Sequence, residues 1–63
     1  MKNSVQEKRW EKNWSQAQLA RICQVSQSTI CDIESNRRIP SLETAMKLAR
    51  ALSTTVDDLF KRE

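Results

Sequence analysis

Histidine and glycine are both absent from this 63-residue chain, and each absence removes a class of function. Without histidine, the chain lacks the commonest general base and the commonest neutral metal ligand. Without glycine, it cannot form a glycine-rich phosphate-binding loop. A chain this short buries only about 60% of its unfolded surface, which leaves no room for a deep catalytic cavity beside the core. We therefore expect one domain spanning residues 1–63 that is not an enzyme and binds no cofactor.

Long apolar runs are absent as well, and none approaches the ~20 residues of a membrane-spanning helix. The first ten residues, MKNSVQEKRW, lack the apolar stretch of a signal peptide. We therefore expect a cytoplasmic protein. That setting disfavours a disulfide between Cys23 and Cys31. Two cysteines with neither a Cys-x-x-Cys motif nor a histidine do not form a zinc site, so no metal is expected.

Positive charge is concentrated in one part of the chain. Residues 1–38 contain seven Lys and Arg against four Asp and Glu, whereas residues 39–63 contain four of each. The whole net charge of +3 therefore belongs to the first part. A one-sided basic footprint is typical of proteins that bind polyanions, although an ordinary solvated surface is the alternative.

Serine and threonine residues stand where helices would begin. Ser15 followed by Gln18 is the pattern of a capping box, and the other caps precede amphipathic or helix-forming stretches. The pattern predicts five short helices and no strand. They are expected at about residues 2–12, at 16–23, and after the caps Ser26, Ser41 and Thr55.

None of these helices can bury its apolar stripe alone, so we expect them to share one core. Trp14 is expected in this core and Trp10 at its partly exposed edge, while Leu48 joins the stripe of the fourth helix. The other predicted members are Val5, Leu19, Ala20, Cys23, Val25, Ile30, Ile33, Leu42, Ala45, Met46, Ala49, Leu52, Leu59 and Phe60.

Several motifs follow one another in a specific order. SQAQLA begins the second helix, VSQSTI begins the third, Glu34 closes it, PSLET begins the fourth and VDDLF the fifth. In this order and spacing the sequence resembles the phage repressor/Cro-like helix-turn-helix family, often called the Xre family, from about Val5 to Phe60. The resemblance implies an all-α, compact five-helix bundle of the lambda-repressor-like DNA-binding type. It also implies a bacterial or phage-encoded protein that works at the nucleoid.

In this family the second and third helices form the helix-turn-helix, and the third enters the major groove of DNA. Family members often carry glycine where this chain has Asn13, Gln24, Asn36 and Ser53. We therefore predict that Gln24 adopts a left-handed conformation in the turn, at a cost of roughly 1 kcal/mol. The resemblance further implies a structural ion pair between Arg9 and Glu34 that orients the third helix.

The DNA contacts are predicted from the third helix and its surroundings. Gln27 and Ser28 match positions where the family commonly contacts bases, and Asp32 faces the same way one turn later. Asp32 has three readings: it accepts from cytosine N4, it holds a neighbouring side chain, or it is a solvated surface residue. The predicted phosphate contacts are Gln16, Ser26, Asn36, Arg37 and Arg38, and one of the two arginines is a candidate for a narrow minor groove.

We expect a homodimer on a palindromic operator, because one module reads too few bases for a useful specificity ratio. Repression is the expected outcome, since the chain has no room for an effector domain. The predicted dimer surface comprises Thr54, Val56, Asp57 and Phe60. The rival hypothesis is a protein–protein module, such as an antitoxin-like or antirepressor-like partner. Cys31 is expected beside the DNA-facing surface, which leaves a redox-sensing role open, whereas Cys23 is expected to be buried.

Overall fold

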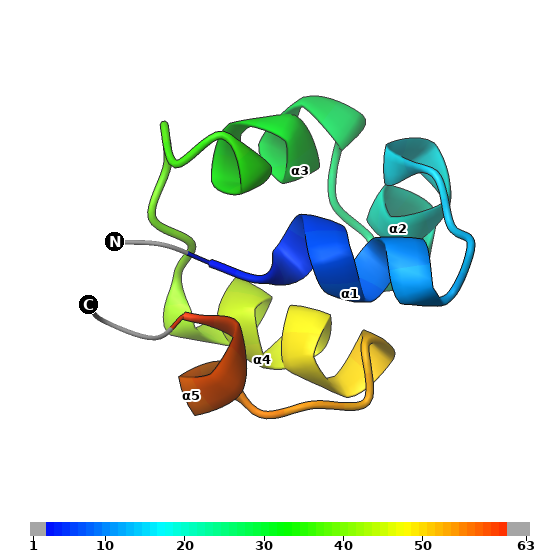
Figure 1. The fold of residues 1–63 in the computed structure, drawn as a ribbon. Coiled ribbons are helices and arrows are strands. Elements are labelled where there is room, and N and C mark those ends of the chain that lie inside the picture. Colours follow the sequence, from blue (N-terminus) through cyan, green and yellow to red (C-terminus); the bar gives the residue numbers. More distant parts are fainter. Residues whose placement is uncertain (1–2, 61–63) are drawn as a thin grey trace.

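The computed structural model describes residues 3–60 and contains five α-helices (Figure 1). They are α1 (Val5–Glu11), α2 (Gln16–Cys23), α3 (Gln27–Glu34), α4 (Leu42–Ala51) and α5 (Val56–Leu59). No strand occurs among these residues, so the predicted all-α fold is confirmed. Helix α1 begins at Val5, later than predicted. The sequence VDDLFKR also predicts that the fifth helix continues to Lys61 and Arg62, which lie outside the described residues. None of the described helices is long and apolar enough to cross a membrane.

All four predicted helix caps are present. The Ser15 hydroxyl accepts a hydrogen bond from the Gln18 amide at 3.1 Å, and the Gln18 side chain accepts one from the Ser15 amide at 2.7 Å. Ser26, Ser41 and Thr55 begin α3, α4 and α5 in the same way, each accepting from the amide three residues later. These bonds satisfy amides that have no partner inside the helix, and they fix where each short helix begins.

Four helices end at a left-handed residue that is not glycine. The Gln24 amide donates to the Arg21 carbonyl at 3.2 Å and the Val25 amide to the Ala20 carbonyl at 3.0 Å, which together form a Schellman motif. The same pair of bonds closes α1, α3 and α4. The left-handed residues are Asn13, Gln24, Asn36 and Ser53, with φ of 59°, 60°, 62° and 57°. The prediction for Gln24 is confirmed, and the turn it makes sets the steep crossing of α2 and α3 (Figure 1).

One apolar core joins the five helices. Trp14, Val25 and Phe60 pack at its edge, and Trp10 is exposed as expected. The buried cluster comprises Val5, Leu19, Ala20, Cys23, Ile30, Ile33, Leu48, Ala49, Leu52 and Leu59, and Ala45 is buried as well.

The core prediction is wrong for Leu42 and Met46, whose exposed fractions are 72% and 49%. Leu48 is fully buried and Leu52 nearly so, and these two residues define the inner line of α4. At about 100° per residue, Leu42 and Met46 lie roughly 100° or more from that line. The simple spacing of apolar residues therefore merged an inner stripe with a second, outer one.

Candidate nucleic-acid interface

Helix α3 presents a small polar surface in its first turn. Gln27 and Ser28 are both exposed there, directly after the turn from α2. The Ser26 hydroxyl caps the helix and also lies 3.1 Å from the Ser28 hydroxyl and 2.8 Å from the Thr29 hydroxyl. The predicted base-contact residues Gln27 and Ser28 therefore stand on one exposed turn beside the predicted phosphate contact Ser26.

Arg37 folds back along helix α3. Its Nε lies 3.6 Å from Oδ1 of Asp32, and its Nη2 contacts Sγ of Cys31 at 3.9 Å. This geometry agrees with the reading in which Asp32 holds a neighbouring side chain. Because an exposed ion pair contributes little to stability, its main effect is to orient the Arg37 side chain. The structure thus brings Asp32, Arg37 and Cys31 together on one side of α3.

A buried ion pair anchors the last turn of α3. Arg9 Nε donates to Glu34 Oε2 at 2.8 Å and Arg9 Nη2 to Glu34 Oε1 at 3.1 Å. The two side chains are only 7% and 3% exposed. Arg9 Nη1 also donates to the Trp14 carbonyl at 2.8 Å. The pair predicted from the resemblance is present, and it ties α1 to the last turn of α3 with bidentate geometry.

Gln16 joins this network from the first turn of α2. Its Nε2 donates to Glu34 Oε1 at 3.0 Å, so one carboxylate links α1, α2 and α3. No buried side-chain nitrogen or oxygen among residues 3–60 lacks a hydrogen-bond partner. Gln16 was predicted only as a phosphate contact. Its inward bond uses one amide hydrogen and leaves the other available at the N-terminus of α2.

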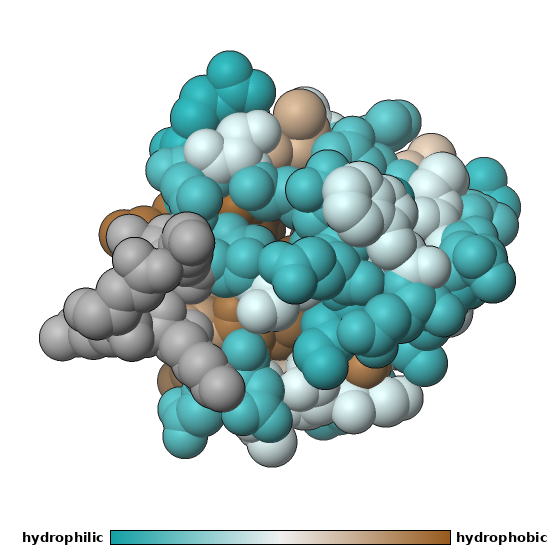
Figure 2. Space-filling view, viewed as in Figure 1, coloured by the Kyte–Doolittle hydropathy of each residue, from teal (hydrophilic) through white to brown (hydrophobic). Residues whose placement is uncertain are grey.

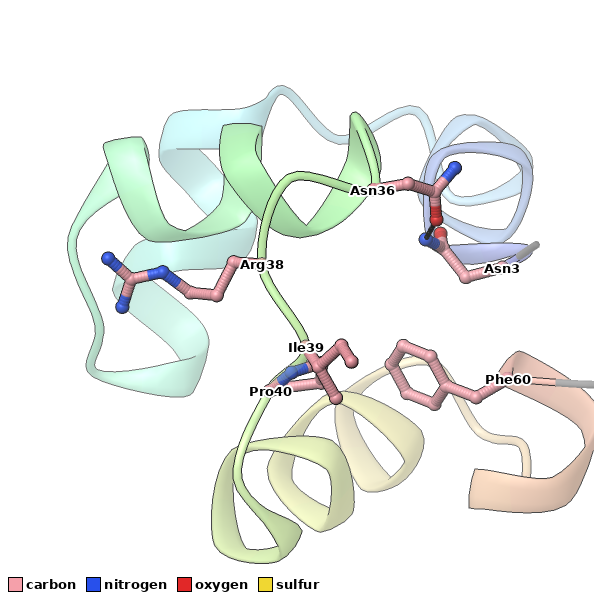
Figure 3. A pocket seen from close by; sticks show the side chains of 6 residues that line it. All are labelled: Asn3, Asn36, Arg38, Ile39, Pro40 and Phe60. Carbon is pink, nitrogen blue, oxygen red and sulfur yellow. Dashed lines mark hydrogen bonds between the residues drawn. The ribbon is translucent and has the colours of Figure 1, made fainter. Parts of the chain in front are cut away.

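Asn3 is a residue that sequence reasoning missed. Its Nδ2 donates to the Ile33 carbonyl at 2.8 Å and to Asn36 Oδ1 at 2.9 Å (Figure 3). These partners are 30 and 33 residues away in the chain, so no local pattern reveals them. The one available signal was an asparagine just before a helix, since its Oδ1 accepts from the Val5 amide at 3.1 Å.

Residues 36–40 connect two different surfaces. Asn36, Arg37 and Arg38, three of the predicted phosphate contacts, are exposed beyond the end of α3. Ile39 and Pro40 follow immediately, and Ile39 is 80% exposed. Figure 3 shows Arg38 pointing away from Asn36, while Ile39 and Pro40 lie near Phe60. One short segment therefore contributes to the basic side and to an apolar side.

The apolar side is centred on a pocket of about 180 Å³ between α4 and α5. The predicted dimer residues Val56 and Phe60 line it, whereas Thr54 and Asp57 do not. Five residues of this side were not predicted as dimer contacts. Leu42, Ala45 and Met46 were placed in the core, and Ile39 and Pro40 were given no role in an interface. The residues of this side, called the apolar face below, are Ile39, Pro40, Leu42, Ala45, Met46, Val56 and Phe60. The face of the molecule drawn in Figure 2 is largely hydrophilic by comparison.

The two thiols are free and differ in exposure. Cys23 is 2% exposed and belongs to the core, whereas Cys31 is half-buried on α3. Burial raises the pKa of the Cys23 thiol, and the positive charge of Lys47 partly offsets that rise. Both placements agree with the expectations from the sequence, and no group of three or more metal-ligating side chains occurs in the described part of the chain.

The fold and the exposed polar turn of α3 are typical of a helix-turn-helix protein, and comparisons with known proteins identify the same class of protein. Residues 5–59 match the family model described as helix-turn-helix. The chain is 37% identical over 60 residues to the uncharacterised HTH-type transcriptional regulator YgzD of Bacillus subtilis (strain 168), covering 95% of this chain and 91% of YgzD. It is 42% identical over 57 residues to the HTH-type transcriptional regulator AnsR of the same organism, covering 90% of this chain but only 49% of AnsR.

A solved structure gives the same result in three dimensions. The N-terminal DNA-binding domain of SinR from Bacillus subtilis superposes with a TM-score of 0.83 at 31% identity, covering 94% of this chain and 90% of that one. This chain belongs to the helix-turn-helix family, in its repressor/Cro-like (Xre) branch. Its class is that of DNA-binding transcription regulators, which are not enzymes.

Proposed function

We propose that this protein is a sequence-specific regulator that binds double-stranded DNA and acts as a repressor. The observation that carries the proposal is the exposed polar first turn of α3, on a helix whose other end is anchored by the buried Arg9–Glu34 pair. A helix that reads bases must offer donors and acceptors on a surface whose position is fixed. Occupying the operator is enough for repression, and the site of action is the cytoplasm, at the nucleoid.

Gln27, Ser28 and Asp32 are the proposed base contacts. Gln27 is free to pair with adenine through N6 and N7, and Ser28 suits either partner of a base pair. Asp32 accepts from cytosine N4 or directs Arg37, whose Nε lies 3.6 Å away, towards the groove. Both roles place the specificity of the protein on the first two turns of α3.

The proposed phosphate contacts surround this surface. Arg37 and Arg38 supply charge after α3, and the eight-residue helix α2 directs its N-terminus to the same side, since Gln16 contacts the end of α3. Amide and hydroxyl groups contribute as well, because about half or more of protein–DNA hydrogen bonds go to phosphate and sugar. The full set is Gln16, Ser26, Asn36, Arg37 and Arg38.

We infer a homodimer that forms through the apolar face. Ile39 and Leu42 are 80% and 72% exposed and line the same pocket as Val56 and Phe60. Met46 is 49% exposed and follows Leu42 by one turn of α4. Contiguous exposed apolar surface marks interaction sites, and a second copy provides a matching one. The proposed interface extends the predicted set Thr54, Val56, Asp57 and Phe60. Two-fold pairing then requires half-sites about 34 Å apart, one turn of DNA.

Selection from a random duplex library tests this function. We expect a palindromic consensus, with Gln27→Ala relaxing the preference at one base position. The matched control is Arg38→Ala, which weakens binding uniformly and reduces the salt slope by about 1. Binding without a preferred sequence, lost entirely at high salt, contradicts the proposal and favours the protein–protein module.

A further inference from the structure

The side chain of Asn3 has a single orientation that satisfies its neighbours. Its Oδ1 accepts from the Val5 amide at 3.1 Å, and its Nδ2 donates to the Ile33 carbonyl at 2.8 Å. Exchanging the oxygen and nitrogen would place donor against donor and acceptor against acceptor. The adjoining backbone is held from α5, because the Ser4 amide donates to the Leu59 carbonyl at 2.9 Å. The second hydrogen of Nδ2 therefore always points at Asn36.

This fixed donor dictates the orientation of the Asn36 amide. Asn36 must present Oδ1 to Asn3, at 2.9 Å, so its own Nδ2 is turned away from Asn3 (Figure 3). Among residues 3–60 this nitrogen donates to no other group. The stem is fixed too, because the Asn36 and Arg37 amides close the Schellman motif of α3 at 3.1 and 2.8 Å. The chain thus holds an amide donor in a set direction, in the same exposed segment as Arg37 and Arg38.

We propose that Asn3 is a positioning residue that directs Nδ2 of Asn36 to a phosphate of the bound DNA. The proposal rests on the proposed function and adds to it a residue outside the helix-turn-helix. Phosphates are bound by neutral amides as well as by cations, and a donor set before binding loses less rotational freedom. Asn36 accepts the left-handed backbone less readily than glycine does, and the gained contact explains why a side chain is present there.

A double-mutant cycle on DNA affinity separates this role from a purely structural one. The variants are Asn3→Ala, Asn36→Gly and their combination, each titrated with one fixed duplex at one salt concentration. We expect each single variant to bind about tenfold more weakly, the lower end of the loss typical of one hydrogen bond to a charged group. In the Asn36→Gly background, Asn3→Ala should have no further effect on affinity. An equal loss in both backgrounds means that Asn3 acts only on the fold, and overturns the proposal.

A second variant and a direct readout complete the test. Asn3→Asp keeps the acceptor for the Val5 amide but turns the Asn36 donor inward, so we expect at least the loss seen with Asn3→Ala. In the wild-type protein, DNA should shift the side-chain amide signals of Asn36 in NMR spectra but leave those of Asn3 in place. Unshifted Asn36 signals overturn the proposal.

The matched control is Asn13→Gly, which makes the same backbone exchange at the end of α1 and should leave DNA affinity unchanged. Thermal denaturation confirms that each variant is folded at the assay temperature. Failure of the wild-type protein to bind any duplex would overturn the proposed function itself. Wild-type binding with additive losses would overturn only the role of Asn3.

Discussion

The side of the bundle formed by α3 and its proposed DNA contacts, called the recognition side below, and the apolar face are stabilised in opposite ways. On the recognition side, α3 is held by a buried carboxylate that accepts from Arg9 and Gln16. No buried side-chain nitrogen or oxygen among residues 3–60 lacks a hydrogen-bond partner. On the apolar face, Leu42 and Ile39 extend into solvent and are covered by nothing in the described chain. The anchoring of α3 is satisfied within one molecule, whereas the apolar face is proposed to be covered by a second copy.

The difference predicts how each surface responds to change. A buried network loses stability when one member is removed, because the remaining charge has no partner. An exposed apolar surface tolerates polar substitution in the monomer but loses association. Mutations on the two sides should therefore separate folding from assembly.

The largest effect is expected from Glu34→Ala on the recognition side. Removing this carboxylate leaves Arg9 buried and unpaired, which costs about 3–5 kcal/mol. The free energy of unfolding from urea denaturation measures this loss. The control is Asp32→Ala, which breaks the exposed pair with Arg37 and should change stability by less than about 1 kcal/mol. Equal losses for the two variants would mean that burial does not distinguish these ion pairs.

The next effect is expected on the apolar face. Leu42→Glu places two like charges at the proposed interface, and we expect the dimer to weaken by about 30-fold or more. Sedimentation equilibrium measures the mass, and the fold should persist because Leu42 is exposed. Ile22→Glu makes a similar exchange at an exposed position outside the apolar face and should leave the mass unchanged. A wild-type protein that is monomeric at high micromolar concentration would rule out the dimer.

A smaller, stabilising effect is expected where the left-handed residues end their helices. Gln24→Gly on the recognition side and Ser53→Gly before α5 remove a left-handed penalty of about 1–2 kcal/mol. The new glycine lowers stability by about 0.5–1 kcal/mol, because it gives the unfolded chain more conformational freedom. Thermal denaturation should show a higher midpoint for both variants. Asn13→Gly should gain less, because asparagine tolerates this conformation better. A Gln24→Gly protein of equal or lower stability would contradict the backbone assignment of the turn.

The smallest effect is the pH dependence that Cys23 adds behind the recognition helix. Because burial raises its pKa above the unfolded value, its contribution to stability is complete below the unfolded pKa of about 8.5 and is lost as pH rises through the folded pKa. The free energy of unfolding should therefore fall more steeply above that pH in the wild-type protein than in Cys23→Ala. Parallel curves for the two proteins would show that the thiol has an unshifted pKa.

Much of the fold followed from local chemistry. Ser15 with Gln18, and the caps of α3, α4 and α5, each depend on atoms within three residues, so the sequence is sufficient to place them. The Arg9–Glu34 pair spans 25 residues and was predicted only through the resemblance. The conformation of Gln24 also came from the resemblance, together with the absence of glycine.

What escaped prediction depends on three-dimensional neighbours. Asn3 gave no pattern, because its partners lie at the far end of α3. Leu42 and Met46 fit the apolar spacing of α4, and only the packing of α2 and α5 shows which stripe faces inward. The base and phosphate contacts stay predictions, since their partner is DNA.

Residues 36–40 link the proposed DNA contacts to the proposed dimer interface. Arg37 and Arg38 lie at one end of this segment, and Ile39 and Pro40 at the other. In the proposed dimer, a rotation of one copy against the other also moves the arginines, because Ile39 alone separates Arg38 from Pro40, whose ring fixes its own φ angle. The length of residues 36–40 then contributes twice, once in each subunit, to the distance between the two half-sites.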